Sequence, residues 1–314
     1  MATTASITPL SKTQPVYPRR RKINWGRILA WAVLILWLLI TIVPLWWIVR
    51  MAFSTLKDLL ANPASLLPVN FTLDAFKRVL GLASVNEIVA QGGFPQKLNF
   101  LLYFRNTFIV TTVVVFVGLV FNSMAAYAFA RLKFPGKNWL FWLYIVALIM
   151  PTILNLIPNF ILIHELGLLN TLAGIIAPGF FGNAFGVFFL RQFFLSINKE
   201  VEEAAKMDGA GILRVFVSIV VPMALPSLMT MSILSYVNAW NEFQWAYFAG
   251  GQGAKEATTV MTVALAHFRA QQQSGTPDFP GMMAGTLISA IPMVVAFMFL
   301  GRKAIDSIKF SGYR

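Results

Sequence analysis

The sequence contains no cysteine, only two histidines and few charged side chains. Without cysteine the chain has no disulfide framework, thiolate nucleophile or iron–sulfur cluster, and His164 and His267 are too isolated to predict a metal site. Charged residues make up 12% of the 314 residues, whereas 58% are hydrophobic and the mean hydropathy is +0.70. This composition is too apolar for a soluble domain and indicates a protein that lies in lipid.

The sequence also lacks the short motifs of common catalytic and nucleotide-binding sites. It has no G-x-x-x-x-G-K-[ST] phosphate loop, no H-E-x-x-H metal pair and no G-x-S-x-G nucleophile elbow. We therefore expect a non-catalytic subunit that binds no cofactor and does not hydrolyse ATP itself. The net charge of +13 comes from short basic clusters between apolar runs rather than from one amphipathic face, which disfavours nucleic acid as a partner.

Six uncharged apolar runs are each long enough to cross a bilayer as a helix. Such a helix needs about 20 apolar residues for a hydrocarbon core of about 30 Å. The runs are Ile28 to Val49, Asn106 to Ala130, Asn138 to Ile163, Leu166 to Leu190, Val215 to Asn241 and Phe279 to Gly301. A barrel would show alternating segments of about ten residues instead. The sequence therefore predicts an all-α integral membrane protein with six transmembrane helices in a domain of residues 28–303.

The distribution of basic residues predicts the orientation of these helices. Of the 25 Lys and Arg residues, eight lie in alternate connections and seventeen lie in residues 1–27, 131–137, 191–214 and 302–314. Basic connections remain in the cytoplasm. Both termini are therefore expected there, as an N-terminal tail of residues 1–27 and a C-terminal tail of residues 304–314.

A longer connection, residues 53–105, follows the first run and is expected to lie outside the membrane. It contains Pro63, Pro68 and Pro95. Long connections of this kind are usually functional or flexible, and the prolines interrupt any long helix. The sequence predicts a small, partly helical lid or docking region.

The connection between the fourth and fifth runs, residues 196–214, carries the most informative motif. It reads Glu200-Val201-Glu202-Glu203-Ala204-Ala205-Lys206-Met207-Asp208-Gly209-Ala210-Gly211. Carboxylates crowd its start, where the helix macrodipole favours them, and Gly209 can adopt the left-handed conformation that ends a helix. Ala204, Ala205 and Met207 are predicted to form a small apolar face. The motif predicts a short exposed helix followed by a tight turn.

This connection resembles the EAA loop of ABC importer membrane subunits. The resemblance rests on Glu203-Ala204-Ala205 and Asp208-Gly209-Ala210, followed by Phe216, Ile219, Pro222 and Pro226. In that family the helix is the coupling helix, which seats in a cleft of the cytoplasmic ATPase and transmits its closure to the spans during alternating access. The resemblance implies an ATPase dimer that uses ATP and magnesium. It also implies the coupling residues Glu203, Ala204, Ala205, Met207, Asp208, Gly209 and Ala210, with the glutamate suited to a basic partner.

Other segments are similar to the carbohydrate branch of this family, whose members carry maltose and related sugars. They are Asn106-Thr107, Ala126 to Leu132, Leu148 to Pro151, Gly167 to Thr171 and Trp240 to Phe243. The resemblance implies a second permease subunit, an external solute-binding protein and a multi-pass location in a bacterial inner membrane. The chain departs from the family at Asn198, where proline is common, and at Phe310 to Arg314, which replace a glycine-rich, lysine-containing tail.

Polar residues within the apolar runs are candidates for the solute pathway. Pro151 and Pro158 are expected to interrupt the third run, and Asn155 and Asn159 lie four residues apart beside them. These amides could hydrogen-bond a polyhydroxylated solute or join helices between the permease halves. Asn241 and Glu242 lie toward the outer end of the fifth run. Glu242 could serve gating or contact the binding protein, or lie at headgroup level without a function.

An autonomous secondary carrier or channel for a polar solute is the alternative function. A carrier needs sites for coupling ions, and the runs contain almost no carboxylate or histidine. The favoured interpretation is a permease subunit that forms half of a pathway for a sugar or sugar-like solute. Sugars, sugar alcohols, glycosides and glycerol phosphodiesters all remain open.

Overall fold

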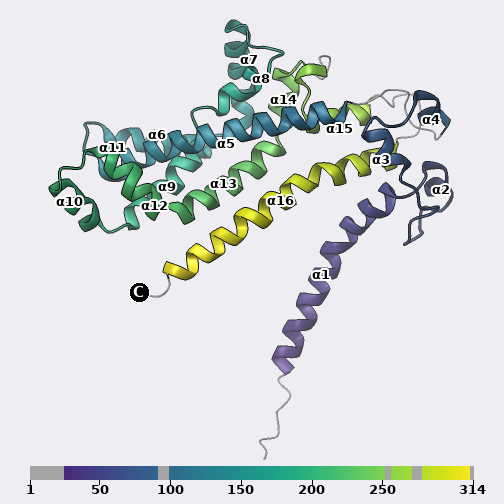
Figure 1. The fold of residues 1–314 in the computed structure, drawn as a ribbon, viewed down its shortest axis with the longest axis horizontal. Helices are drawn as coiled ribbons and strands as arrows, with labels where there is room; N and C mark the ends of the chain where they lie inside the picture. The colour runs from purple at the N-terminus through teal and green to yellow at the C-terminus, as the bar shows by residue number, and fades with distance from the viewer. Residues whose placement is uncertain (1–24, 91–98, 252–255, 271–277, 312–314) are drawn as a thin grey trace, which may run out of the picture. The chain divides into compact units, whose positions relative to one another are not determined.

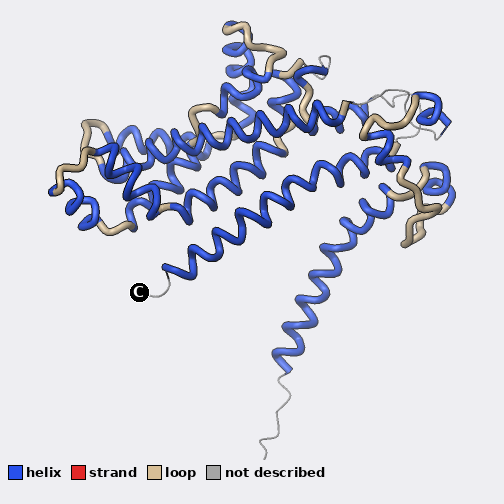
Figure 2. The backbone as a smooth tube through the Cα atoms, viewed as in Figure 1, coloured by secondary structure: helices blue, strands red, loops and turns tan. Residues whose placement is uncertain are grey.

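The computed structural model describes residues 25–90, 99–251, 256–270 and 278–311. Most of the predicted N-terminal tail and the last three residues of the C-terminal tail lie outside this part of the chain, as does the side chain of His267. The chain divides into two compact units, Met1–Trp46 and Trp47–Arg314. The described residues are helical or irregular and include no strand (Figure 2). The predicted all-α fold is confirmed.

Among the described residues, three helices and three bent helix pairs are long and apolar enough to cross a membrane. The continuous ones are α1 (Trp25–Ala52), α5 (Phe100–Arg131) and α16 (Phe279–Ser311). The first bent pair joins α6 (Lys137–Ile149) to η1 (Thr152–Asn155) and α7 (Leu156–Glu165) at an angle of 103°. The second joins α8 (Leu172–Ile176) and η2 (Ala177–Gly179) to α9 (Ala184–Ser196) at 43°. The third joins α11 (Ile212–Val215), η3 (Phe216–Val220) and α12 (Val221–Met223) to α13 (Leu225–Trp240) at 77°. Each bent pair counted as one span gives the six predicted spans.

The third span breaks at one of its two prolines. Pro151 follows the end of α6, and the residue before it, Met150, is extended at ψ 125°, as expected ahead of a proline. Pro158 does not interrupt α7. It is the third residue of that helix, where a backbone amide has no partner within the helix to lose.

Two predicted spans begin six residues away from the predicted position. The fourth run was expected to be helical from Leu166, but Gly167 and Asn170 have φ of +67° and +60° and turn the chain. The helix therefore begins at Leu172. In the second span α5 already begins at Phe100, because Arg105 does not end a helix although it ends the uncharged run.

Shorter helices occupy the connections. They are α2 (Leu56–Ala61), α3 (Asp74–Val79), α4 (Val85–Ala90), α10 (Lys199–Met207), α14 (Gln244–Ala249), η4 (Glu256–Thr258) and α15 (Met261–Ala270). The segment predicted to be external is thus partly helical. Arg50 is fully buried and stabilises the start of this segment. Its Nη2 donates to the carbonyl of Asn62 at 2.9 Å, and its guanidinium lies 4.8 Å from the centre of the Trp47 ring.

Helix α5 is the central element of the unit Trp47–Arg314. It contributes Tyr127 and its neighbours to a core with α9 and α11–α13, Tyr103 to a core with α3, α15 and α16, and Val110 to a core with α8, α14 and α15. Figure 1 shows α5 running beside α9 and α13, with α16 on the other side of α13. Interior positions of α5 are therefore constrained along its whole length.

A buried ion pair joins residues that are far apart in the sequence. Arg78 of α3 donates through Nη2 to Oδ1 of Asp278 at 2.9 Å, and the two side chains are 6% and 1% exposed. The same carboxylate oxygen accepts the Gly281 amide at the start of α16 at 2.9 Å. The pair therefore fixes the predicted external segment to the last span.

Asp278→Asn is expected to lower the free energy of unfolding by about 3 kcal/mol, because it removes the buried negative charge that faces the Arg78 guanidinium. Thermal unfolding of the purified protein in detergent measures the change. Lys77→Ala is the control: Lys77 pairs with Asp74 at 3.5 Å but is 60% exposed, so the expected loss is below about 1 kcal/mol. Equal losses for the two variants would contradict the role of the buried pair.

Candidate functional site

The predicted coupling loop folds as α10 and a tight turn. Asn198, at the position where proline is common in the resembled family, caps the helix: its side-chain oxygen accepts the Glu200 amide at 3.1 Å. After the helix Gly209 has φ of +83°. The amides of Gly209 and Ala210 donate to carbonyls of the last helical turn at 3.0 and 2.9 Å, which is the Schellman arrangement. The predicted short helix and its glycine stop are confirmed.

The small residues of α10 do not form one apolar face. Ala205 and Ala210 are half-buried and pack against the core of α5, α9 and α11–α13, whereas Ala204 and Met207 are exposed. Met207 is 88% exposed. The prediction that Ala204, Ala205 and Met207 share a face is wrong, because helical residues one or two positions apart point in different directions.

The adjacent glutamates of α10 lie in different environments. Glu203 is exposed, as is Asp208. Glu202 is only 2% exposed, and its Oε1 lies 2.6 Å from Nε of Arg131, the last residue of α5. The Tyr127 hydroxyl donates to the other carboxylate oxygen at 3.4 Å. The sequence alone does not distinguish Glu202 from the exposed glutamates beside it, so this buried pair was not predicted.

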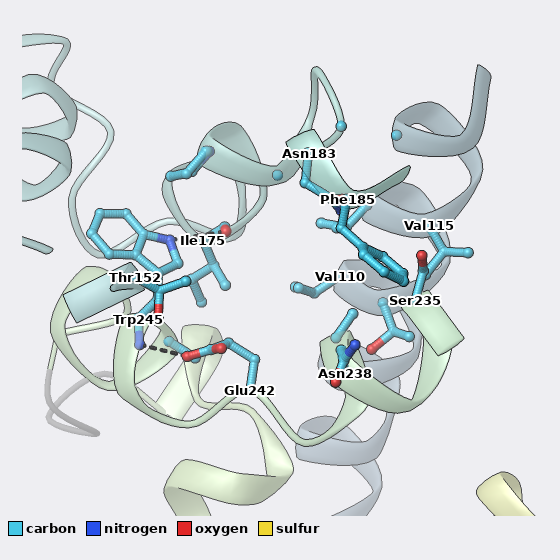
Figure 3. Close-up of a pocket in the computed structure, with 18 of the residues that line it drawn as sticks. Val110, Val115, Thr152, Ile175, Asn183, Phe185, Ser235, Asn238, Glu242 and Trp245 are labelled. Atoms are coloured by element: carbon cyan, nitrogen blue, oxygen red, sulfur yellow. Dashed lines mark hydrogen bonds between the residues drawn. The ribbon is translucent and has the colours of Figure 1, made fainter. Parts of the chain in front are cut away.

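A cavity of about 670 Å³ lies between α5, α13, α14 and the breaks of the third and fourth spans. Figure 3 shows side chains from these elements around the hollow. The polar lining residues are Thr107, Thr111, Thr152, Asn155, Asn159, Asn183, Ser235, Asn238, Glu242, Gln244 and Thr262. Aromatic side chains also line it, among them Phe185, Trp240 and Trp245. Amides, hydroxyls and aromatic rings together suit a ligand with both polar and apolar faces.

Three of the four predicted pathway residues lie at this cavity. Asn155 and Asn159 line it from the third span, and Glu242 lines it from the segment after α13. Asn241 does not belong to the lining. Its side-chain amide is exposed and donates to the Val237 carbonyl at 2.8 Å, so it ends α13 locally.

Glu242 has a structural contact of its own. Its Oε1 accepts the backbone amide of Trp245 at 2.9 Å, at the start of α14 (Figure 3). The Trp245 indole N–H donates to the Ile175 carbonyl at 3.0 Å. The carboxylate is therefore held at the cavity by one backbone bond and is otherwise exposed to solvent.

The break before α9 is built around a buried amide of α5. Asn122 is 2% exposed, and its side-chain oxygen accepts the Asn183 amide at 2.9 Å. Gly182, with φ of +80°, and Gly186 lie against this side chain: a Cβ on either would come 2.2 or 2.3 Å from an Asn122 atom. The four-residue spacing of Gly182 and Gly186 therefore permits close packing against Asn122. The partner, Asn122, could not be identified from the sequence.

Gly182→Ala is expected to lower the free energy of unfolding by about 2–5 kcal/mol, since the methyl group meets Asn122 and the left-handed conformation disfavours alanine. Gly211→Ala adds the same methyl group at φ of −69° with nothing within 4 Å, and should cost less than about 1 kcal/mol. Thermal unfolding distinguishes them; similar unfolding temperatures would show that the Asn122 contact does not constrain the break.

Comparisons with known proteins agree with this arrangement. Residues 115–304 match the family described as "Binding-protein-dependent transport system inner membrane component". The chain is 28% identical over 284 residues to the diacetylchitobiose uptake system permease protein NgcG of Streptomyces coelicolor, covering 90% of this chain and 87% of that one. It is 31% identical over 294 residues to the probable ABC transporter permease protein YurM of Bacillus subtilis, covering 92% and 89%.

Two further similarities concern a sugar permease and a solved structure. The chain is 30% identical over 272 residues to the trehalose transport system permease protein SugB of Mycobacterium tuberculosis, covering 85% of this chain and 90% of that one. Its structure also superimposes on a chain of a bacterial ABC transporter involved in the import of the acidic polysaccharide alginate. The TM-score is 0.73 and the sequence identity 24%, and the match covers 92% of this chain and 99% of that one. The latter establishes the likeness of fold.

Proposed function

Because the chain belongs to the family of binding-protein-dependent transport system inner membrane components, we propose that it is one permease subunit of an ABC importer for a sugar or sugar-like solute. The observation that carries this proposal is similarity along nearly the whole chain to permeases named for diacetylchitobiose and trehalose. The family match over residues 115–304 includes α10 and most of the residues that line the cavity. The proposed partners are a second permease, a cytoplasmic ATPase dimer and an external solute-binding protein.

The exposed face of α10 supports coupling to the ATPase. Met207 is an apolar side chain with 88% of its surface open to solvent, and Glu203 and Asp208 are exposed beside it. Contacts within the chain do not account for such an exposed methionine, whereas an apolar cleft in a partner does. Glu203 is free to pair with a basic residue of that partner. ATP and magnesium belong to the ATPase subunit, and coupling is mechanical.

The cavity supports a polyhydroxylated solute. Its volume of about 670 Å³ falls within the range of about 300–1,000 Å³ for ligand pockets. The Asn155, Asn159 and Asn238 amides each offer donors and an acceptor, as sugar hydroxyls require. Glu242 is the one ionisable residue among the described residues that line the cavity. A carboxylate there disfavours an anionic solute, so uncharged sugars are better candidates than glycerol phosphodiesters.

A pull-down of the tagged chain from detergent-solubilised native membranes tests the proposal. Recovery of a second permease together with ATP-hydrolysing activity supports an importer. Recovery of the chain alone, combined with solute uptake into liposomes without ATP, contradicts it and favours an autonomous carrier.

Replacing both Glu203→Gln and Gly209→Ala is expected to reduce the ATPase recovered with the chain by on the order of tenfold, because the partner loses a charged contact and the turn that presents Met207 is strained. Glu200→Gln is the matched control, since Glu200 is an exposed carboxylate of the same helix. The unfolding temperature should change little in the control. Undiminished ATPase recovery in the double variant would rule out this face as the docking surface.

A further inference from the structure

Helix α10 is joined along the chain to its neighbours by segments that are not regular α-helix. Before it, Ile197 and Asn198 are extended, with ψ of 136° and 127°. After it, the left-handed Gly209 turn, the π-helical segment η3 and a bend of 77° separate it from α13. These joints can absorb a displacement of α10 unless a stiffer contact holds that helix to the spans.

The ion pair of Glu202 with Arg131 is such a contact. Both side chains are 3% exposed, and Nε and Oε1 are 2.6 Å apart. The guanidinium Nη2 also donates to the Ile197 carbonyl at 2.5 Å, so Arg131 holds both α10 and the extended residue before it. Two charges buried in this way cannot slide apart without leaving one of them unpaired. The contact therefore resists movement of α10 relative to the end of α5.

Arg131 connects this contact directly to the cavity. It is the last residue of α5, which continues without interruption for 32 residues. The same helix lines the cavity with Thr107, Thr111 and Gly118. A regular helix transmits an axial or rotational displacement along its length because every backbone group is fixed to its own turn.

We propose that the Arg131–Glu202 pair is the mechanical link through which movement of α10 reaches the cavity-lining face of α5. This inference rests on the proposed coupling of α10 to an ATPase. Arg131 and Glu202 are positioning residues: both are buried, so neither is available to the ATPase, and neither lines the cavity. Exposed Glu203 would contact the ATPase, and buried Glu202 would transmit the movement of α10 to Arg131.

The absence of cysteine provides a direct test. Ser235→Cys places a single thiol on the cavity wall (Figure 3), and all variants are compared within this background. In the assembled complex in nanodiscs, the rate of modification by a charged methanethiosulfonate reagent is measured with and without ATP plus vanadate, which traps the ATPase. The Ser235→Cys chain without further substitutions serves as the reporter. Its modification rate is expected to change on the order of tenfold with ATP, as is typical for coupled sites.

Glu202→Gln is expected to keep the ATPase bound and hydrolysing, while the ATP-dependent change in labelling falls below about twofold. Adding Arg131→Gln removes the unpaired charge. This double variant should unfold at a higher temperature than the single variant and still show no ATP-dependent change. If the double variant recovers both stability and the labelling change, the pair serves folding only and the proposal is overturned. An undiminished change in either variant also overturns it.

A milder variant covers the case in which these complexes do not assemble. Arg131→Lys retains the buried charge but replaces the fixed Nε and Nη2 donors with a single flexible ammonium, so the labelling change should fall about threefold with the ATPase still bound. An unaltered change in Arg131→Lys contradicts the link.

Glu200→Gln is the control and should behave as the reporter alone. If the reporter background itself recovers no ATPase or shows no ATP-dependent change, the proposed function fails and this inference fails with it. That result differs from a loss confined to the variants of Arg131 and Glu202.

Discussion

Backbone amides and carbonyls inside a hydrocarbon layer have no water to bind, so every interruption of a spanning helix needs a substitute partner. Three spans of this protein are bent within their apolar length. At the break before α9, the Asn122 side chain accepts the Asn183 amide. At the segment before α15, the Asn106 side chain donates to the carbonyls of Ala257 and Thr259 at 2.9 and 3.0 Å. The break before α9 and the segment before α15 thus each rely on a polar side chain, and both side chains come from the unbroken helix α5.

Polar residues within the apolar spans are therefore of two kinds. Asn106 and Asn122 are almost fully buried and are occupied by backbone groups of neighbouring segments. Thr107 likewise accepts the Met261 amide at 2.8 Å, although it also borders the cavity. Asn155, Asn159 and Asn238 are not buried and face the hollow. The first kind maintains the scaffold and the second kind is available to a solute, so polarity at membrane depth alone does not identify a pathway.

The sequence was sufficient for features that depend on local chemistry. Hydropathy placed the six spans, Pro151 predicted the break in the third, and Gly209 predicted the end of α10. It was insufficient where the conformation or burial of a residue depends on a partner far away in the sequence. Gly182 could not be seen as the site of a bend without Asn122, and Glu202 could not be distinguished from Glu203 because two consecutive glutamates look alike until the helix is placed against Arg131. The predicted start of the second span was wrong because the uncharged run stops at Arg105. A charged residue ends an uncharged run, but it does not end a helix.

In the part of the chain that the structure describes, two buried ion pairs lie at the two predicted membrane faces, Arg78–Asp278 at the outer one and Arg131–Glu202 at the inner one. Stability alone does not require them, because well-packed apolar residues in place of a buried pair are often neutral or stabilising, whereas removing one partner costs about 3–5 kcal/mol. An apolar contact tolerates sliding, since dispersion depends weakly on direction. A buried pair resists separation instead, because moving its charges apart leaves each of them buried without a counterion. Placed between α10 and α5, it fixes how the exposed helix and the cavity wall move relative to each other, which apolar packing would leave undetermined.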